Sequence, residues 1–463
     1  MKESVELDDR SISQRLTTTH TNQKVYQTTE ARLKALLKIA LALLLVSLPF
    51  KHSKGLMYTS EAIIGSIFLF DIYKNKARAY LFETIRENPF IWIIGLYSAT
   101  VLLSVFFSFN PIYSAKQFVY EIIINVTLFF ILIYLYQREF ITLKQTLHIL
   151  ILTNLIFISI FLLQGLQWYL FPSHPLMRNI SRGIRKPEVW QIFFELSRYS
   201  DLFSYKAVTT YVLFFAALGL AYLYLPIPFR DKLKPICLGI ANVTVAISSM
   251  LKAPIVAIGF AIALSPLLPL KRNQRIKILY SNVILIALFL FLIFFSPLKT
   301  YFLRGENLTS LVHGKYRKWG SFGSRIIIYK TYVKQILKHP FIGVGIGRRN
   351  IKFAFPDSVK ESRHTHAHNV FLNVALQQGI QSVLMLFVFI FLQLRYGISI
   401  LRTFTAHLDS RYIYVLAFVI WICMFWTRSS FDDMFRHSIS TYYWVLMSPF
   451  TFCLVSTRQD QNA

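Results

Sequence analysis

Cysteine and the acidic residues are both scarce in this 463-residue chain. The three cysteines, Cys237, Cys423 and Cys453, all fall in hydrophobic stretches, which favours buried apolar side chains over a disulfide or metal framework. Asp and Glu together number 22 against 50 Lys and Arg, so the formal net charge is +28. In a membrane protein such an excess has two sources, the loops that hold orientation and any pocket that binds anions.

The chain also lacks the polar composition of a soluble protein. Only 16% of its residues are charged whereas 55% are hydrophobic, and the mean hydropathy is +0.48. These values are typical of polytopic membrane proteins. The basic residues are scattered between apolar runs rather than grouped on one face, which argues against binding to nucleic acid. No small-residue cleavage site follows the first apolar run, so we expect an uncleaved first span.

Long apolar runs predict the spans. A helix needs about 20 mostly apolar residues to cross a bilayer. We therefore expect an all-α polytopic membrane protein with about 12 transmembrane helices. They are predicted near residues 35–50, 57–73, 89–107, 119–136, 147–171, 207–226, 235–250, 254–270, 278–297, 370–395, 411–427 and 438–456.

The distribution of Lys and Arg predicts the orientation. Basic residues occur in the N-terminal arm and in every second connection, at 74–88, 137–146, 227–234, 271–277 and 396–411. By the positive-inside tendency these connections and both termini face the cytoplasm. The opposite face then carries two long loops, 172–206 and 298–369, and both are basic. An anionic ligand at that surface accounts for their charge.

These boundaries divide the chain into four parts. They are a cytoplasmic arm (1–34), an N-terminal transmembrane bundle with loop 172–206 (35–236), a core with a large periplasmic loop at 298–369 (237–395), and C-terminal transmembrane helices (396–463). Only loop 298–369 is long enough to form a small subdomain outside the membrane.

The later part of this loop shows a helical pattern. Between residues 324 and 338 apolar side chains recur at helical spacing, with Arg325 and other basic residues interleaved, which predicts an amphipathic helix on or near the membrane. His339-Pro340 ends it, because proline cannot continue the hydrogen-bond ladder. The glycines of 343–347 then form a flexible turn. No strand precedes them, so they do not match a dinucleotide-binding fingerprint.

Three histidines at alternate positions, His364, His366 and His368, follow at the end of the loop. Lying beside several arginines at a membrane surface, they suggest chemistry on an anionic, lipid-borne substrate. Alternate residues of an extended segment face the same way, so His366 shares a pocket with His364 or with His368. A zinc site would need further ligands, and the neighbouring sequence offers none, so we expect no metal.

Three runs of residues carry a family resemblance: 325–329 (RIIIY), 339–345 (HPFIGVG) and 366–369 (HAHN). Together with the new span that follows, they resemble the O-antigen ligase and polymerase superfamily of bacterial inner membranes. Ligases in this superfamily are described by a histidine followed by Asn, Ser or Gln, nine further residues and a glycine. His368-Asn369, residues 370–378 and Gly379 fit that spacing, while Ser382 stands where the pattern usually has Gly, Thr or Tyr.

The resemblance implies a GT-C-like enzyme of lipopolysaccharide biosynthesis. Such ligases transfer a glycan from undecaprenyl pyrophosphate to a sugar hydroxyl of lipid A-core, at the periplasmic face of the inner membrane and without a nucleotide sugar or cofactor. His368 and Arg325 match family positions, the histidine acting at the acceptor and basic residues holding the pyrophosphate. A family arginine between two spans corresponds to Lys252, which keeps the charge but loses the bidentate fork that suits phosphate.

The same residues suit a single displacement with inversion. An imidazole, with an ordinary pKa of about 6.5, can take a hydroxyl proton at neutral pH, and arginine donors stabilise charge on a departing pyrophosphate. Structural alternatives remain: His368 only caps the next helix, Arg325 contacts headgroups, and Lys252 snorkels to the interface. Further candidates for binding pyrophosphate or acceptor are Lys116, Arg348, His366 and Asn369.

Three other functions stay open at this point. An O-antigen polymerase joins two undecaprenyl-linked glycans and tends to use two basic loops, which loop 172–206 permits. A protein O-oligosaccharyltransferase uses the same donor. A polysaccharide or lipid transporter usually carries ionisable groups at mid-membrane depth, and here Glu61 and Glu121 are the main ones. The gathering of polar features in one outer loop favours surface catalysis.

Overall fold

The computed structural model describes residues 28–75, 78–171, 202–248, 252–269, 272–295, 320–362, 365–403, 410–432 and 436–462. Every regular element in these residues is a helix, and the one extended pairing among them is an isolated bridge between Phe50 and Phe203. The predicted all-α class is therefore confirmed.

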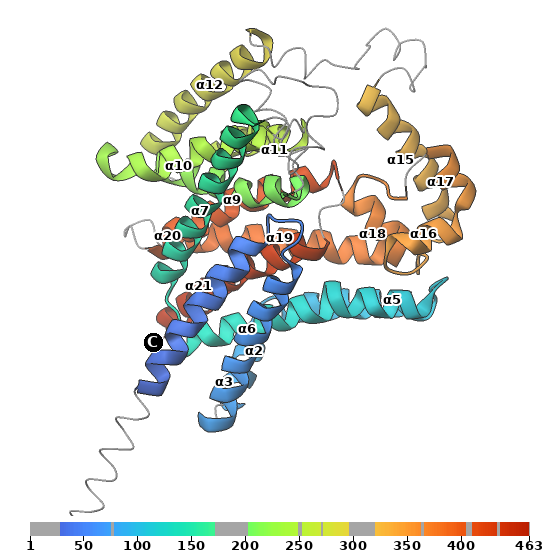
Figure 1. The fold of residues 1–463 in the computed structure, drawn as a ribbon, viewed down its shortest axis with the longest axis horizontal. Helices are drawn as coiled ribbons and strands as arrows, with labels where there is room; N and C mark the ends of the chain where they lie inside the picture. Colours follow the sequence, from blue (N-terminus) through green and yellow to red (C-terminus); the bar gives the residue numbers. More distant parts are fainter. Residues whose placement is uncertain are drawn as a thin grey trace, which may run out of the picture.

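The helices follow one another along the chain as shown in Figure 1. A helix over 28–47 is followed by α2 (Lys54–Asn75), α3 (Arg78–Glu87), α4 (Ile91–Phe106), α5 (Pro111–Phe118), the π-helical segment η1 (Val119–Ile123), α6 (Ile124–Gln137) and α7 (Leu143–Leu170). Next come α9 (Tyr205–Tyr224), α10 (Phe229–Ser248), α11 (Lys252–Leu264), η3 (Ser265–Leu267) and α12 (Arg272–Phe295). The last are α15 (Gly320–Lys338), α16 (Arg348–Ala354), α17 (Pro356–Ser362), α18 (Val370–Gln378), α19 (Ile380–Thr403), α20 (Ser410–Ser429) and α21 (His437–Asn462).

Seven helices of the described part are long and apolar enough to cross a membrane. They cover Lys54–Lys74, Pro111–Gln137, Leu143–Gln167, Lys206–Tyr224, Ile380–Thr403, Ser410–Ser429 and Ser438–Thr457. An eighth span is added if α3 and α4, which meet at a bend of 84°, count as one. The chain is thus a multi-pass membrane protein, but the predicted number of twelve spans is not confirmed.

The prediction of one continuous span over 370–395 is wrong, because the chain breaks at Gly379. This residue has a φ of +93°, and a Cβ there would collide with the carbonyl of Phe341. The following amide, on Ile380, donates a 2.8 Å hydrogen bond to the carbonyl of Pro340. The segment after α15 therefore packs against the break. As a result α18 is a separate helix of nine residues that ends before the long helix α19 begins.

The glycine turn at 343–347 is present and is held in place by hydrogen bonds. The amides of Val344 and Gly345 donate to the carbonyls of Leu376 and Gln377 at the end of α18, over 3.0 and 2.9 Å. Gly345 has a φ of +98°, and a side chain there would collide with Ser108. Glycine thus permits the turn to lie between α18 and the connection before α5.

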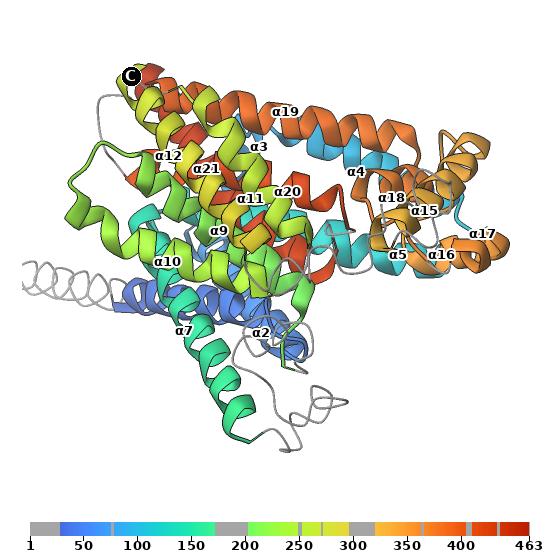
Figure 2. The same ribbon diagram turned by 90° about the horizontal axis from the view of Figure 1, so that it is seen from above.

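The connection before α5 and the segment 343–350 meet at one end of the bundle, whereas residues 172–201 and 298–319 of the two predicted loops lie outside the described residues. Phe109 donates its amide to the carbonyl of Val344 over 3.3 Å, and the Asn350 side chain donates to Ser114 over 2.7 Å. Figures 1 and 2 place α15, α16, α17 and α18 at this end and the C-terminus at the other. We call it the loop end. It has a small apolar core of its own, which includes Tyr332 of α15.

The predicted amphipathic helix at 324–338 is confirmed as the greater part of α15, which ends at Lys338, just before His339-Pro340. The expectation of buried cysteines is correct for Cys453 and wrong for Cys237, which is exposed on α10; all three are free. A hydrophobic stretch predicts apolar surroundings but not burial in protein, because lipid supplies those surroundings to residues on the outer face of the bundle, such as Cys237.

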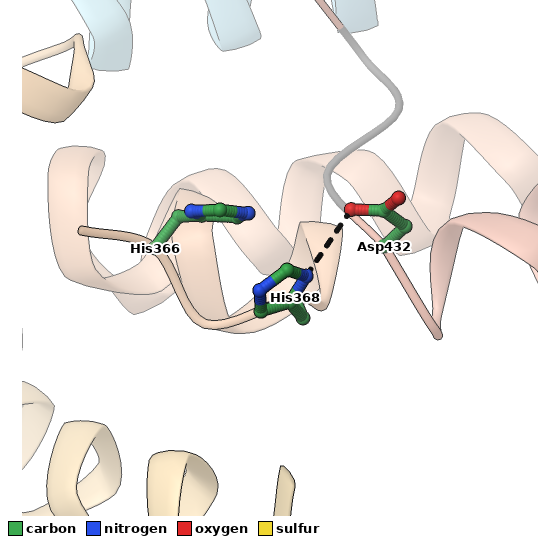
Figure 3. Close-up of side chains that lie close together, drawn as sticks. All are labelled: His366, His368 and Asp432. Carbon is green, nitrogen blue, oxygen red and sulfur yellow. Dashed lines mark ion pairs between the residues drawn. The ribbon is translucent and has the colours of Figure 1, made fainter. Parts of the chain in front are cut away.

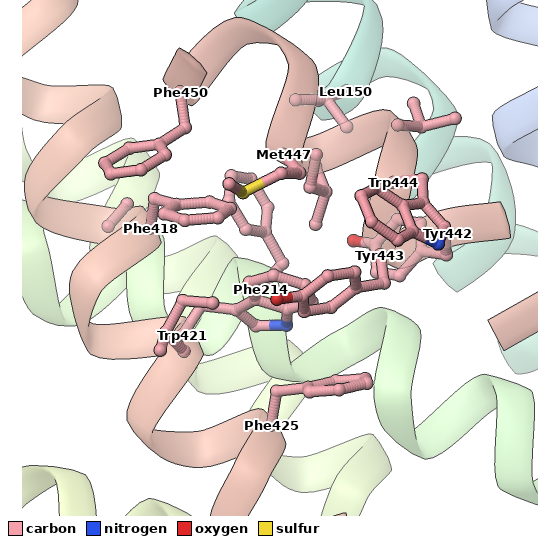
Figure 4. Packing of buried hydrophobic residues seen from close by; sticks show 14 of the residues in the cluster. Leu150, Phe214, Phe418, Trp421, Phe425, Tyr442, Tyr443, Trp444, Met447 and Phe450 are labelled. Carbon is pink, nitrogen blue, oxygen red and sulfur yellow. The ribbon is translucent and has the colours of Figure 1, made fainter. Parts of the chain in front are cut away.

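The main apolar core fixes α20 and α21 beside α9. Trp421 of α20 is fully buried, with its ring centroid 5.6 Å from that of Tyr443 in α21 and 6.1 Å from that of Phe214 in α9 (Figure 4). Large interlocked rings leave little freedom for the helices to slide. Residues 430–432, which follow α20, are consequently held at a defined place in the loop end.

We predict that Gly379→Ala destabilises the protein by about 1–3 kcal/mol, because alanine must adopt a strained positive φ and displace Phe341. Thermal unfolding in detergent, followed by tryptophan fluorescence, measures the change. Gly259→Ala is the matched control, since that glycine lies in the helix α11 with open space around its Cβ position. Equal melting temperatures for the two variants would contradict the role given to Gly379.

Candidate functional site

His366, His368 and Asp432 lie together at the loop end (Figure 3). The Nδ1 atom of His368 is 3.5 Å from Oδ1 of Asp432, and the two imidazole rings have centroids 4.0 Å apart. His366 thus shares its pocket with His368, one of the two predicted arrangements; His364 lies outside the described residues. Asp432 comes from the connection between α20 and α21, far from the histidines in sequence.

The position of His368 follows from the start of α18. Its φ is +50°, a left-handed conformation that histidine tolerates better than most residues. The next residue, Asn369, is the N-cap of α18, and its side-chain oxygen accepts from the amides of Phe371 and Leu372 at 2.9 and 3.1 Å. Its side-chain nitrogen donates to the Ser430 carbonyl over 2.8 Å. Asn369 therefore begins the helix and also attaches it to the segment that carries Asp432.

The carboxylate of Asp432 also binds Lys206, in the first turn of α9. The Nζ atom of Lys206 is 2.7 Å from Oδ1, and the two side chains are 21% and 14% exposed. Burial raises the pKa of the Asp432 carboxyl, but the hydrogen bond from His368 and the charges of Lys206 and Arg428 outweigh it and hold this pKa below its ordinary range. Asp432 is therefore an anion between two nitrogen groups.

Arg428 joins the end of α20 to the start of α9. Its side chain is 1% exposed and donates to the hydroxyls of Thr209 and Thr210, the latter over 3.1 Å. A buried guanidinium needs such partners because burial removes its water. The contact brings Lys206 and the segment after Ser429 to the same point.

The amphipathic helix α15 covers this segment from another side. The guanidinium carbon of Arg325 lies 5.9 Å from the ring centroid of Phe431. One turn further, the Tyr329 hydroxyl is 3.5 Å from the Ser430 carbonyl. The structure therefore brings the predicted Arg325 next to the residue that precedes Asp432.

His366 is a neutral imidazole in this setting. It is 9% exposed; burial and the positive charges of Arg348 and its neighbours lower its pKa to about 2. Arg348 is the first residue of α16 and is close enough to act on His366 electrostatically. The next residue, Arg349, lies over the ring of Tyr113 at 5.4 Å. Arg348 thus joins the cluster, whereas Arg349 faces α5.

Two other predicted residues lie elsewhere at the loop end. Lys116 of α5 lines a separate cavity between α2, α5 and α21. Lys252 is the first residue of α11. The helices α9 and α10 pack together and are joined by a short turn, so they run in opposite directions. The end of α10 therefore lies at the same end of the bundle as Lys206, at the start of α9. Lys252 shares that end, but none of the contacts described above joins it to His368.

Asp432, which is distant from the histidines in sequence, supplies a third possible ligand group that the neighbouring sequence does not. His366, His368 and Asp432 offer ligand atoms within 4.8 Å of one another. Lys206 already lies 2.7 Å from the Asp432 oxygen, so a cation at this point would have to displace an ammonium group. Several basic side chains surround the three groups, and their charge opposes metal binding.

Sequence reasoning missed Asp432, Lys206 and Arg428. One signal for Asp432 was available: two adjacent acids, Asp432-Asp433, interrupt two long apolar runs in a chain that has only 22 acidic residues. Glu121 was noticed as a charge within a span, and the structure explains it by a partner. Its carboxylate lies in η1, 3.6 Å from Nε of Arg436.

Comparison with known proteins agrees with the resemblance found in the sequence. Residues 236–390 match the model of the O-antigen ligase family. Its members are membrane glycosyltransferase-like enzymes, ligases or polymerases, that act on lipid-linked glycans. No curated protein matches the chain. The matched stretch contains Lys252, Arg325, Arg348, His366, His368 and Asn369.

We predict that Asp432→Asn lowers stability in a pH-dependent way. A carboxyl whose folded pKa is depressed contributes stability above its unfolded pKa of about 3.9 and loses it as the pH falls through the folded value. The difference in unfolding free energy between wild type and Asp432→Asn should be constant above about pH 5 and shrink below pH 4. Chemical denaturation at several pH values measures it.

A double-mutant cycle with Lys206→Met separates the ion pair from other losses. Removing one partner leaves the other half-buried charge uncompensated, so the double variant should be more stable than the sum of the single effects implies. Additive losses would show that the 2.7 Å contact contributes nothing to folding.

Proposed function

We propose that the chain is an O-antigen ligase, which transfers a glycan from undecaprenyl pyrophosphate to a sugar hydroxyl of lipid A-core. One observation carries this proposal. His368, within the stretch that matches the ligase family, lies against the anionic Asp432 among basic side chains at one end of a transmembrane bundle. This arrangement provides a proton acceptor and an anion site at a membrane surface, where a lipid-linked donor and a lipid-linked acceptor meet.

His368 is the proposed general base. Its Nδ1 atom faces Asp432, so Nε2 is the nitrogen that would take the proton of the acceptor hydroxyl. A carboxylate beside the imidazole stabilises the imidazolium that this transfer forms. The positive φ at His368 and the Asn369 cap fix the ring direction before substrate arrives.

Arg325 and Arg348 are the proposed anion-binding residues. As the acceptor oxygen forms its bond to the anomeric carbon, the bond from that carbon to the phosphate oxygen breaks. The electron pair leaves with undecaprenyl pyrophosphate, and the proton stays on His368. Guanidinium groups aimed at the departing oxygens stabilise that charge, and attack opposite the leaving group inverts the anomeric centre.

The neutral His366 has a different proposed role. With a pKa lowered to about 2, it stays uncharged at any physiological pH and can accept a hydrogen bond from a sugar hydroxyl. It thereby helps to bind the acceptor, as Asn369 does by holding α18. Lys206 keeps Asp432 ionised and oriented.

The charge distribution supports a periplasmic site in the inner membrane. Basic residues such as Lys74, Arg138 and Arg230 occur in the connections at the end opposite to His368. By the positive-inside tendency that end faces the cytoplasm, and the proposed catalytic cluster then faces the periplasm.

We predict that His368→Ala abolishes transfer. The test uses a strain that lacks its own ligase, with lipopolysaccharide separated on a gel. Wild type should restore a glycan ladder on lipid A-core, and the variant should leave the glycan on its undecaprenyl carrier. His339→Ala, which changes an exposed histidine at the end of α15, should behave as wild type.

The same gel separates the competing functions. If wild type lengthens carrier-linked glycan without capping the core, the chain is a polymerase. If His368→Ala equals wild type at equal membrane abundance, His368 is not the base.

The transfer rate should depend on the planar shape of the Arg325 guanidinium as well as on its charge. We predict that Arg325→Gln lowers the initial transfer rate about 100-fold or more and that Arg325→Lys lowers it less, since lysine keeps the charge and loses the fork. Initial rates with purified chain and undecaprenyl-linked glycan measure both. Lys334→Gln, on the same helix, is the control; an equal loss there would mean that Arg325 acts only through the charge of α15.

A further inference from the structure

A second polar cavity lies at the loop end, apart from His368. It has a volume of about 450 Å³ and is lined by α2, α5, η1, the start of α6, the start of α21, the segment 50–53 and Ser204. Three lysines line it, Lys51, Lys54 and Lys116, and Glu61 is its one acidic residue. The other polar side chains of the lining are Gln117 and six that carry hydroxyls: Ser53, Tyr58, Tyr120, Ser204, Ser438 and Thr441.

The mouth of this cavity is built from two paired segments. The amide of Lys51 donates to the Leu202 carbonyl over 3.0 Å, and the amide of Ser204 donates to the Pro49 carbonyl over 2.9 Å. Between these bonds Phe50 and Phe203 form the antiparallel bridge, with ring centroids 5.2 Å apart. The backbone of Lys51 is thus held in a fixed rim of the cavity, so that little backbone entropy is lost when an anion binds there.

Each of the two long walls carries a lysine at the loop end and aromatic or apolar residues further in, and Glu61 of α2 is the one charged residue beyond the lysines. On α2 the lining residues Lys54, Met57, Tyr58 and Glu61 recur at helical spacing and form one face. Glu61 lies about 10 Å along the helix axis from Lys54, so its charge is separated from the rim.

The opposite wall shows the same gradient. Lys116 lies in the last turn of α5, and Tyr120 of η1 and Ile124 of α6 follow towards the membrane interior. The rings of Tyr58 and Tyr120 approach to 6.4 Å between centroids. An anion fits at the lysines, and an apolar chain fits below them.

The membrane can reach this cavity from the side. Only 28% of the apolar stretch of α2 is buried inside the protein, and the helix lies at the lower edge of the ribbon, below α6 (Figure 1). Tyr58, on the lining face, is itself exposed. A lipid that diffuses in the bilayer can therefore place its head at the rim while its chain stays between α2 and α5.

We propose that this cavity binds the phosphate head of a membrane lipid, with the lysines at the phosphate and the aromatic walls along the chain. Only the further step, that the lipid is a polyprenyl carrier held beside the catalytic cluster before or after transfer, rests on the proposed function. The cavity adjoins the proposed catalytic cluster, because its lining residue Ser204 is two residues from Lys206, which binds Asp432. Two residues span about 7 Å of extended chain.

The test measures lipid retention rather than transfer. Purified full-length chain is mixed with undecaprenyl phosphate or with phosphatidylglycerol, and native mass spectrometry counts the lipid that stays bound. The combined variant Lys51→Gln, Lys54→Gln and Lys116→Gln should weaken retention about 100-fold, with each lysine contributing about fivefold. Lys360→Gln, an exposed lysine of α17, should have no effect.

Each outcome decides between alternatives. Selective loss of undecaprenyl phosphate supports a polyprenyl site, and equal loss of both lipids supports a general phospholipid site. Equal retention by wild type and the combined variant overturns the proposal. His368→Ala should keep full retention while it loses transfer. If the chain transfers no glycan and the lysines still govern retention, the proposed function fails and the lipid site remains.

Discussion

The loop end depends on one carboxylate. Asp432 binds Lys206 at 2.7 Å and lies 3.5 Å from His368, so it holds together α9, the start of α18 and the connection between α20 and α21. In surroundings that are otherwise strongly basic, an unbalanced cation would repel its neighbours and disperse these elements. A single anion at this point lets basic side chains gather around a histidine, and the space that they surround then attracts a further anion, the substrate.

The second constraint is the attachment of the segment 430–432. The Ser430 carbonyl accepts hydrogen bonds from the Asn369 side chain and the Tyr329 hydroxyl. The guanidinium of Arg325 lies over the Phe431 ring. Below it, the rings of α20 and α21 fix where the segment leaves the membrane. A binding site on a short connection normally moves with its loop. Here the large core and the helix α15 hold residues 430–432 from both sides, which suits a carboxylate that must orient the His368 imidazole.

Local patterns predicted the elements, whereas long-range contacts decided the site. The helix at 324–338 was predictable because its apolar residues repeat with the helical period, and His339-Pro340 stops it within one residue. The break at Gly379 was not, since hydropathy continues through it and the cause is the distant Phe341. His368, Arg325 and Arg348 were found through a motif and a charge excess. Lys206 and Asp432 are 226 positions apart and carry no mutual signal in one sequence.

The length of α18 has a consequence for the spacing of its two ends. One end is fixed by Asn369 on the Ser430 carbonyl, and the other by Ile380 on the Pro340 carbonyl. Each residue turns an α-helix by about 100° and advances it by about 1.5 Å. One residue more or fewer would rotate the His368 ring away from Asp432 while the glycine turn stayed docked. The length of α18, nine residues, therefore determines the direction of the His368 imidazole relative to the membrane bundle.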